Sequence, residues 1–67
     1  MLAKEMVNVV ECALAISHRR ARTIVGEFMR QYKGYKDAIS AVDAEFTPEG
    51  RIKFIYIINQ QKQHIIL

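Results

Sequence analysis

The segment Ile16–Lys33, ISHRRARTIVGEFMRQYK, constrains the fold of this chain more than any other stretch, because it predicts one amphipathic helix. At about 100° per residue, one side of that helix collects the apolar residues Ala21, Ile24, Val25, Phe28, Met29 and Tyr32. The other side collects Arg19, Arg22, Thr23, Gly26, Arg30 and Lys33. Such a helix buries its apolar side in a core, and its basic side is suited to an anionic partner.

The length of the chain limits how much of its apolar content it can hide. The 67 residues predict a single domain spanning residues 1–67, and 51% of them are hydrophobic. A domain of this size buries only about 60% of the surface that its unfolded chain exposes. We therefore expect a homodimer or docking on a partner, since either would cover the remaining apolar surface.

A first helix is expected over Leu2–Ile16, where the strongly polar side chains share one narrow face and the rest is apolar. An apolar surface of that width predicts packing on several sides. Ser17 is a plausible N-cap for the second helix. We expect that helix to end near Lys33, with Gly34 following it in a left-handed conformation.

The C-terminal half predicts strands. Ala38–Phe46 alternates apolar and polar residues, Thr47–Gly50 has turn residues in their usual places, and Arg51–Ile58 is rich in β-branched and aromatic residues. After a polar turn, Gln63–Leu67 is a possible short third strand. The fold class is therefore α+β, with two N-terminal helices packed on a small antiparallel β-hairpin or three-stranded meander. Arg51–Ile58 is apolar on both faces, which favours a central or interface strand.

Positive charge is concentrated in one part of the chain. The formal net charge of the whole chain is +3. Residues 18–36 carry six lysines and arginines against one acid, a net charge of +5, whereas residues 37–50 carry −4. This distribution indicates an anionic partner for the second helix, either nucleic acid or an acidic protein.

The stretch VVECALAISHRRARTIVGEFMR (residues 9–30) has the apolar spacing of two helices joined by a short turn, with buried positions at Val10, Leu14, Ile16, Ala21 and Ile24. Over residues 10–30 it resembles a helix-turn-helix (winged-helix-like) DNA-binding motif, although Ala15 and Ile16 stand where the motif usually has a glycine. The resemblance implies that the start of the second helix enters the major groove of duplex DNA. It implies nucleic-acid contacts from His18, Arg19, Arg20, Arg22 and Thr23, with Arg30 and Lys33 near phosphates.

The inventory of reactive side chains predicts no enzyme. Cys12, His18 and His64 are the only cysteine and histidines, which are too few for a structural zinc site, and no glycine-rich phosphate loop is present. We expect no catalytic residues, no metal and no cofactor. The single Cys12 lies among apolar neighbours, where a thiol behaves as a small hydrophobe in a reducing, cytoplasmic setting. Neither a signal peptide nor a membrane-spanning segment is predicted.

These features lead to two functional hypotheses from different classes. The first is a small, non-enzymatic, dimeric regulator that places its basic helix on DNA. The alternative is a small inhibitor or adaptor, of the kind that phages and mobile elements encode, which binds a host protein through the basic face or an exposed strand. A purely structural subunit, sealed into an oligomer by its apolar first helix, is a third possibility.

Overall fold

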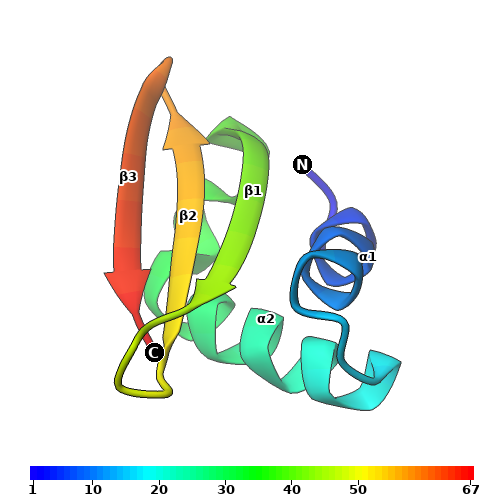
Figure 1. Cartoon of the computed structure of the whole chain (residues 1–67). Coiled ribbons are helices and arrows are strands. Elements are labelled where there is room, and N and C mark those ends of the chain that lie inside the picture. The colour runs from blue at the N-terminus through cyan, green and yellow to red at the C-terminus, as the bar shows by residue number, and fades with distance from the viewer.

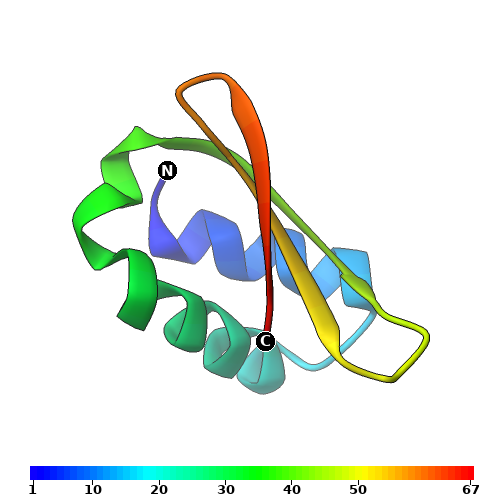
Figure 2. The same cartoon turned by 90° about the vertical axis from the view of Figure 1, so that its left-hand side faces the viewer.

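The computed structural model describes residues 1–67, and it forms two layers (Figure 1). The elements follow one another as α1 (Ala3–Leu14), α2 (His18–Tyr32), the 3₁₀ helix η1 (Lys33–Ala38), β1 (Ile39–Phe46), β2 (Ile52–Ile58) and β3 (Gln61–Ile66). The sheet is three-stranded with the order β1-β2-β3, so the α+β prediction with a three-stranded meander is confirmed. Both helices lie on the same side of the sheet (Figure 2). No helix has the length and apolar character needed to cross a membrane.

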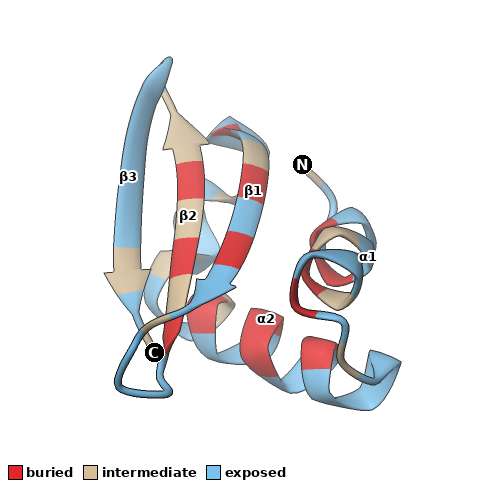
Figure 3. Cartoon of the chain, in the orientation of Figure 1, coloured by how far each residue is buried: buried red, intermediate tan, exposed pale blue.

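The register of the sheet sorts its side chains onto two faces. β2 pairs antiparallel with both neighbours, so Ala44 lies opposite Phe54, and Ile55 lies opposite both Asp43 and His64. Because successive residues of a strand point to opposite faces, one face carries Val42, Ala44, Phe54 and Tyr56, all of which are buried. The bands of buried residues on β1 and β2 follow this alternation (Figure 3).

Aromatic rings join α2 to the sheet. The Phe28 ring is fully buried and stacks on the Phe54 ring, with 4.1 Å between ring centroids, and on the Tyr32 ring at 4.9 Å. The core is completed from the first helix by Met6, Val7, Val10 and Leu14. Phe28 thus fixes which side of α2 faces the sheet, and the basic side of the helix must face away from it.

The connection between α1 and α2 is three residues long. Ala15 adopts a left-handed conformation with φ of 53°, and its N–H donates to the Glu11 carbonyl. The Ser17 hydroxyl accepts a hydrogen bond from the Arg20 backbone N–H at 3.1 Å, which confirms the predicted N-cap. The predicted turn over Thr47–Gly50 is also present, with φ of 81° at Gly50.

α2 ends at Tyr32, which confirms the predicted end near Lys33, but the conformation of the residues that follow differs from the expectation. Gly34 does not adopt a left-handed conformation; instead the chain continues from α2 into η1 without a break. The Met1 nitrogen donates to the carbonyls of Lys36 at 3.0 Å and Ile39 at 2.9 Å. The N-terminus of the chain therefore provides hydrogen-bond donors for one carbonyl within η1 and one just after it.

The packing of α1 is narrower than its composition predicts. Only one stripe of the helix is buried, and Cys12 lies on the opposite side, exposed. The expectation that Cys12 behaves as a buried hydrophobe is therefore wrong. The alternation of β1 would place Phe46 on the same face as the buried Val42 and Ala44, but Phe46 lies in the last pair of the hairpin and is 48% exposed. The thiol of Cys12 and the ring of Phe46 are therefore both in contact with solvent.

Candidate nucleic-acid interface

The side of α2 that faces away from the sheet carries a row of cationic side chains. Arg19, Arg22 and Arg30 are exposed there, and η1 adds the exposed Lys33 and the half-exposed Lys36. We call these five residues the basic surface. At a rise of about 1.5 Å per residue, the distance from Arg19 to Lys33 along the helix axis is roughly 21 Å.

None of the five cations of the basic surface has an ionic partner within the chain. The contacts between acids and basic side chains lie elsewhere: the imidazole Nδ1 of His18 is 3.5 Å from Glu11 Oε2, and Lys53 Nζ forms an ion pair with Glu45 Oε1 at 3.6 Å. Glu27 is the only acid on α2, and it forms no ion pair. The basic surface is therefore uncompensated positive charge in solvent, which attracts anions over a distance set by the ionic strength.

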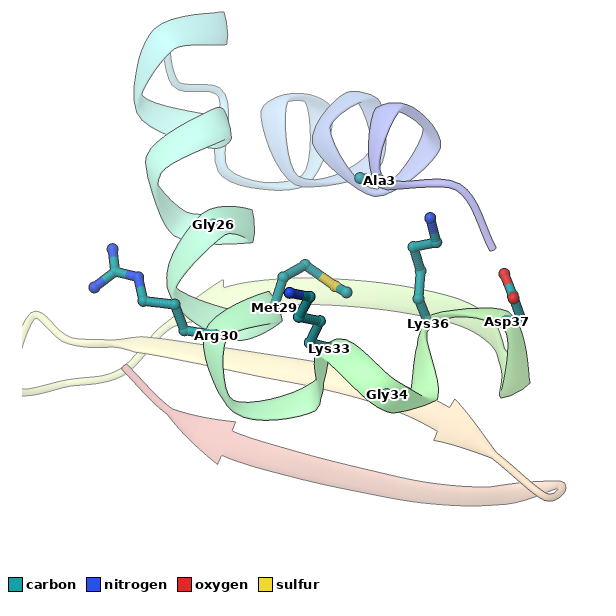
Figure 4. A pocket seen from close by; sticks show the side chains of 8 residues that line it. All are labelled: Ala3, Gly26, Met29, Arg30, Lys33, Gly34, Lys36 and Asp37. Atoms are coloured by element: carbon teal, nitrogen blue, oxygen red, sulfur yellow. The ribbon is translucent and has the colours of Figure 1, made fainter.

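A hollow of about 610 Å³ lies beside the C-terminal half of this surface, where α2, η1 and the start of α1 meet (Figure 4). Lys36 extends from η1 toward Ala3 of α1, whereas Arg30 extends away from the other labelled side chains (Figure 4). Gly26 forms part of the lining, and a Cβ atom added there would meet no atom within 4 Å. Because it has no side chain, Gly26 leaves a notch on the basic side of α2 that forms part of this open hollow, whose lining includes Arg30, Lys33, Lys36 and one acid, Asp37.

The residues predicted to contact DNA from the first turns of α2 are all exposed, but they differ in what they already bind. The Thr23 hydroxyl donates to the Arg19 carbonyl at 3.2 Å, and His18 faces Glu11. Arg19, Arg20 and Arg22 have no ionic partner. Arg20 lies on a different flank of the helix from Arg19 and Arg22, one that it shares with Glu27, because seven residues make about two turns.

The structure adds Lys36 to the residues predicted from the sequence. The sequence predicts a helix that ends before Lys36, with Gly34 following it. In the structure η1 follows α2 directly, and both Lys33 and Lys36 line the same hollow. The net charge of residues 18–36, which included Lys36, was the signal that indicated it. The contact residues were predicted from a helix that ends near Lys33, so the predicted set does not include Lys36, about one turn further along the chain.

In the core behind this surface, one ionisable group, the Tyr56 phenol, has a shifted pKa. Burial raises the pKa of the Tyr56 phenol to about 12, and the neighbouring Tyr32 phenol adds to the rise. Tyr56 lies on the sheet side of α2, against the Phe28 ring at 5.1 Å between centroids. It therefore takes no direct part in the basic surface.

No three side chains among the histidines, cysteines and acids of the chain come together in a way that would hold a metal ion. The chain matches no known protein-family model, no curated protein and no solved structure. The basic surface is therefore the feature of the molecule that indicates a function.

Proposed function

We propose that this protein is a small, non-enzymatic nucleic-acid-binding protein, and that its basic surface contacts the phosphate backbone of duplex DNA. The observation that carries the proposal is the row of five cations without ionic partners on one side of α2 and η1. Each cation that neutralises a phosphate releases condensed counterions, which favours binding at low and moderate salt. A regulatory role on DNA is the simplest use of such binding.

The helix pair supports a helix-turn-helix style of docking. α1 and α2 are joined by three residues, a length typical of that motif. Ala15 adopts the left-handed conformation for which the motif usually employs glycine. An α-helix with its side chains is about 10–12 Å across, and the major groove is about 12 Å wide. Arg19, Arg20 and Arg22 are the base-reading candidates, because His18 and Thr23 already have partners within the chain.

The double variant Arg19→Ala/Arg22→Ala tests the proposal through the salt dependence of DNA binding. Two lost phosphate contacts lower the slope of log K against log salt by about 2, and affinity at low salt falls at least about tenfold. The matched control is Arg51→Ala/Lys53→Ala, which removes the same charge from the sheet side of the molecule. Equal losses in the two double variants, or no loss in the first, would overturn the proposal.

The single variant Arg20→Ala separates backbone contact from groove reading. If the basic surface alone binds phosphates, this variant retains nearly the wild-type affinity, because Arg20 lies off that surface. If the first turn of α2 reads bases, the variant loses about 1–3 kcal/mol of preference for its best sequence over a scrambled one. Competition binding with both duplexes distinguishes these outcomes.

We also infer a reducing, cytoplasmic location from Cys12. Its thiol is exposed on α1 and has no second cysteine with which to pair. In an oxidising compartment such a thiol forms disulfides between molecules. Titration of the thiol in protein purified without reductant tests the inference: one reactive thiol per chain is expected, and a quantitatively disulfide-linked protein would contradict it.

A second candidate function is protein binding through the outer edge of β3. β3 is the last strand of the sheet, so one of its edges is unpaired, and most of its residues are exposed. Such an edge can accept an extended segment of another protein as an added strand. Protein purified at low salt distinguishes the candidates. Bound nucleic acid with a raised absorbance at 260 nm favours the first, and a stoichiometric partner that slows amide exchange in β3 favours the second.

A further inference from the structure

The face of the sheet that points away from the helices is not covered by any element of the chain (Figures 1 and 2). The pairing register places nine residues on it, three from each strand. We call this the outer sheet face. It consists of Ala41, Asp43 and Glu45 from β1, Lys53, Ile55 and Ile57 from β2, and Lys62, His64 and Ile66 from β3.

The centre of the outer sheet face is apolar. Ile55 and Ile57 of the central strand are half-buried although no helix lies over them, and Ile66 is 41% exposed. A shallow hollow of about 310 Å³ lies beside them, with Ala41 and Lys62 in its lining. An antiparallel sheet that only faces water normally carries polar residues on that side. Isoleucines at its centre therefore indicate a surface that is covered by something apolar.

The charges on the outer sheet face are separated by sign. Both acids, Asp43 and Glu45, are on β1, whereas β3 carries the cation Lys62 and the imidazole of His64. These two strands flank β2, so the acidic and basic rows are about 10 Å apart, two strand spacings. Lys53, on β2, is paired with Glu45 of its own chain. The face thus has an acidic margin, an apolar centre and a basic margin.

We propose that the outer sheet face binds the same face of a second copy of this chain, about a twofold axis parallel to the strands. A rotation about that axis lays β1 of one copy over β3 of the other, so each acidic margin meets a basic margin. A twofold axis across the strands would instead lay β1 over β1 and β3 over β3, bringing like charges together. Charge complementarity therefore selects one arrangement of two stacked sheets.

The register makes this arrangement specific. Asp43 and His64 both lie opposite Ile55 within the sheet, so in the dimer Asp43 of one copy faces His64 of the other across the interface. By the same register Lys62 faces Ala41 and Glu45 faces Ile66, so Lys62 meets Asp43 of the other copy diagonally, from the neighbouring row. Ile55 and Ile57 face their own counterparts near the axis. Two such sheets pack face to face about 10 Å apart. Lys53 also approaches its counterpart, but the carboxylate of Glu45 at 3.6 Å compensates its charge.

Two charge-reversed variants test the proposal by mixing. In Asp43→Lys/Glu45→Lys both margins become basic, and in Lys62→Glu/His64→Glu both become acidic. All four positions are exposed, so the fold is expected to survive. Sedimentation equilibrium is expected to show wild type at twice the 7.8 kDa mass of the chain, and each variant alone with a dimer Kd at least about tenfold higher. An equimolar mixture restores the dimer, because both of its contacts then join opposite charges.

Each other outcome overturns the proposal. These outcomes are a monomeric wild type at high micromolar concentration, variants that remain dimeric alone, or folded variants that fail to associate when mixed. If both variants remained dimeric, and substitutions at the unpaired edge of β3 instead abolished the dimer, the two copies would pair edge to edge. The test does not depend on DNA binding, since none of the four positions belongs to the basic surface.

Oxidative footprinting of the wild-type protein gives a measurement that needs no variant. Protection of Ile55 and Ile57 is expected to increase with protein concentration, whereas Leu2, 60% exposed on the helix side, serves as the internal control. Equal labelling of Ile55 and Ile57 at low and high concentration would contradict the stacked-sheet dimer. The variant Ile55→Thr, which keeps strand propensity, is expected to raise the dimer Kd about tenfold.

Discussion

The two uncovered faces of this molecule differ in kind. The basic surface of α2 and η1 is a row of cations without ionic partners, beside a hollow whose lining includes a single acid, Asp37, whereas the outer sheet face carries both signs around an apolar centre. A surface of one sign repels its own copy and attracts a polyanion. A face with both signs in separate rows complements its own copy when it is rotated. The same small chain therefore offers two surfaces with different partners, and the Phe28 contact with the sheet keeps them on opposite sides.

The largest expected effect comes from breaking the layer that separates the two faces. Phe28→Ala removes a fully buried ring that contacts Phe54, Tyr32 and Tyr56, and it is expected to cost about 3–5 kcal/mol. A domain of this size has a total stability of the same order. Urea unfolding followed by circular dichroism should show a largely unfolded variant that has lost both surfaces. Phe46→Ala, at an exposed aromatic, is the control and should cost less than about 1 kcal/mol.

Alkaline pH is expected to loosen the same layer without a mutation. The pKa of Tyr56 is raised to about 12 in the folded protein, above its ordinary value of 10.0. The unfolded chain therefore loses this proton first, so the contribution of Tyr56 is intact below pH 10 and is lost as the pH rises toward 12. The urea midpoint should fall across that range, and less steeply in Tyr56→Phe. Identical slopes in the two proteins would show that another group controls the alkaline transition.

A crossed pair of variants sharpens the distinction between the faces. Arg30→Glu/Lys33→Glu is expected to weaken DNA binding about a hundredfold at low salt while leaving self-association unchanged. Asp43→Lys/Glu45→Lys is expected to do the reverse, weakening self-association and retaining DNA binding. Fluorescence anisotropy with a labelled duplex and sedimentation of the free proteins measure the two effects. If either variant impaired both properties, the two faces would not be independent.

The smallest expected effect is that of Gly26→Ala, which tests whether DNA affinity depends on the shape of the basic surface as well as on its charge. Gly26→Ala is expected to stabilise the fold by about 1 kcal/mol, because alanine is the better helix former and its Cβ meets no atom within 4 Å. If DNA is held by charge alone, its affinity should stay within about twofold of wild type. A larger loss would show that a ligand group occupies the hollow beside Gly26. Thermal melts and the same anisotropy measurement give both numbers.

Local patterns in the sequence accounted for most of the fold. The periodicity of residues 16–33 predicted which side of α2 is buried, and Ser17 and Gly50 marked a helix start and a turn that are both present. These features depend on neighbours within about four residues, so they can be recognised without tertiary information. The apolar residues on both faces of residues 51–58 likewise predicted a central or interface strand, and β2 is the central strand of the sheet.

Long-range contacts account for what the sequence did not reveal. Gly34 is a suitable helix terminator by residue type, but η1 continues past it, and the Lys36 carbonyl of η1 accepts a hydrogen bond from the nitrogen of Met1, 35 residues away. On α1, apolar residues surround most of the helix, so composition could not say which side would pack or that Cys12 would be exposed. The acidic and basic margins of the outer sheet face required the strand register, which brings Asp43 and His64 into one row.

The basic surface lies opposite the open side of the sheet, and this position determines how many segments of nucleic acid a dimer can bind. Two copies stacked through their sheets would direct their α2 helices outward at opposite poles of the particle. Such a particle cannot grip both halves of one palindromic duplex as a conventional repressor dimer does. It would instead be a bivalent crosslinker that tethers two separate segments of nucleic acid, and its hallmark would be looping or bridging of DNA.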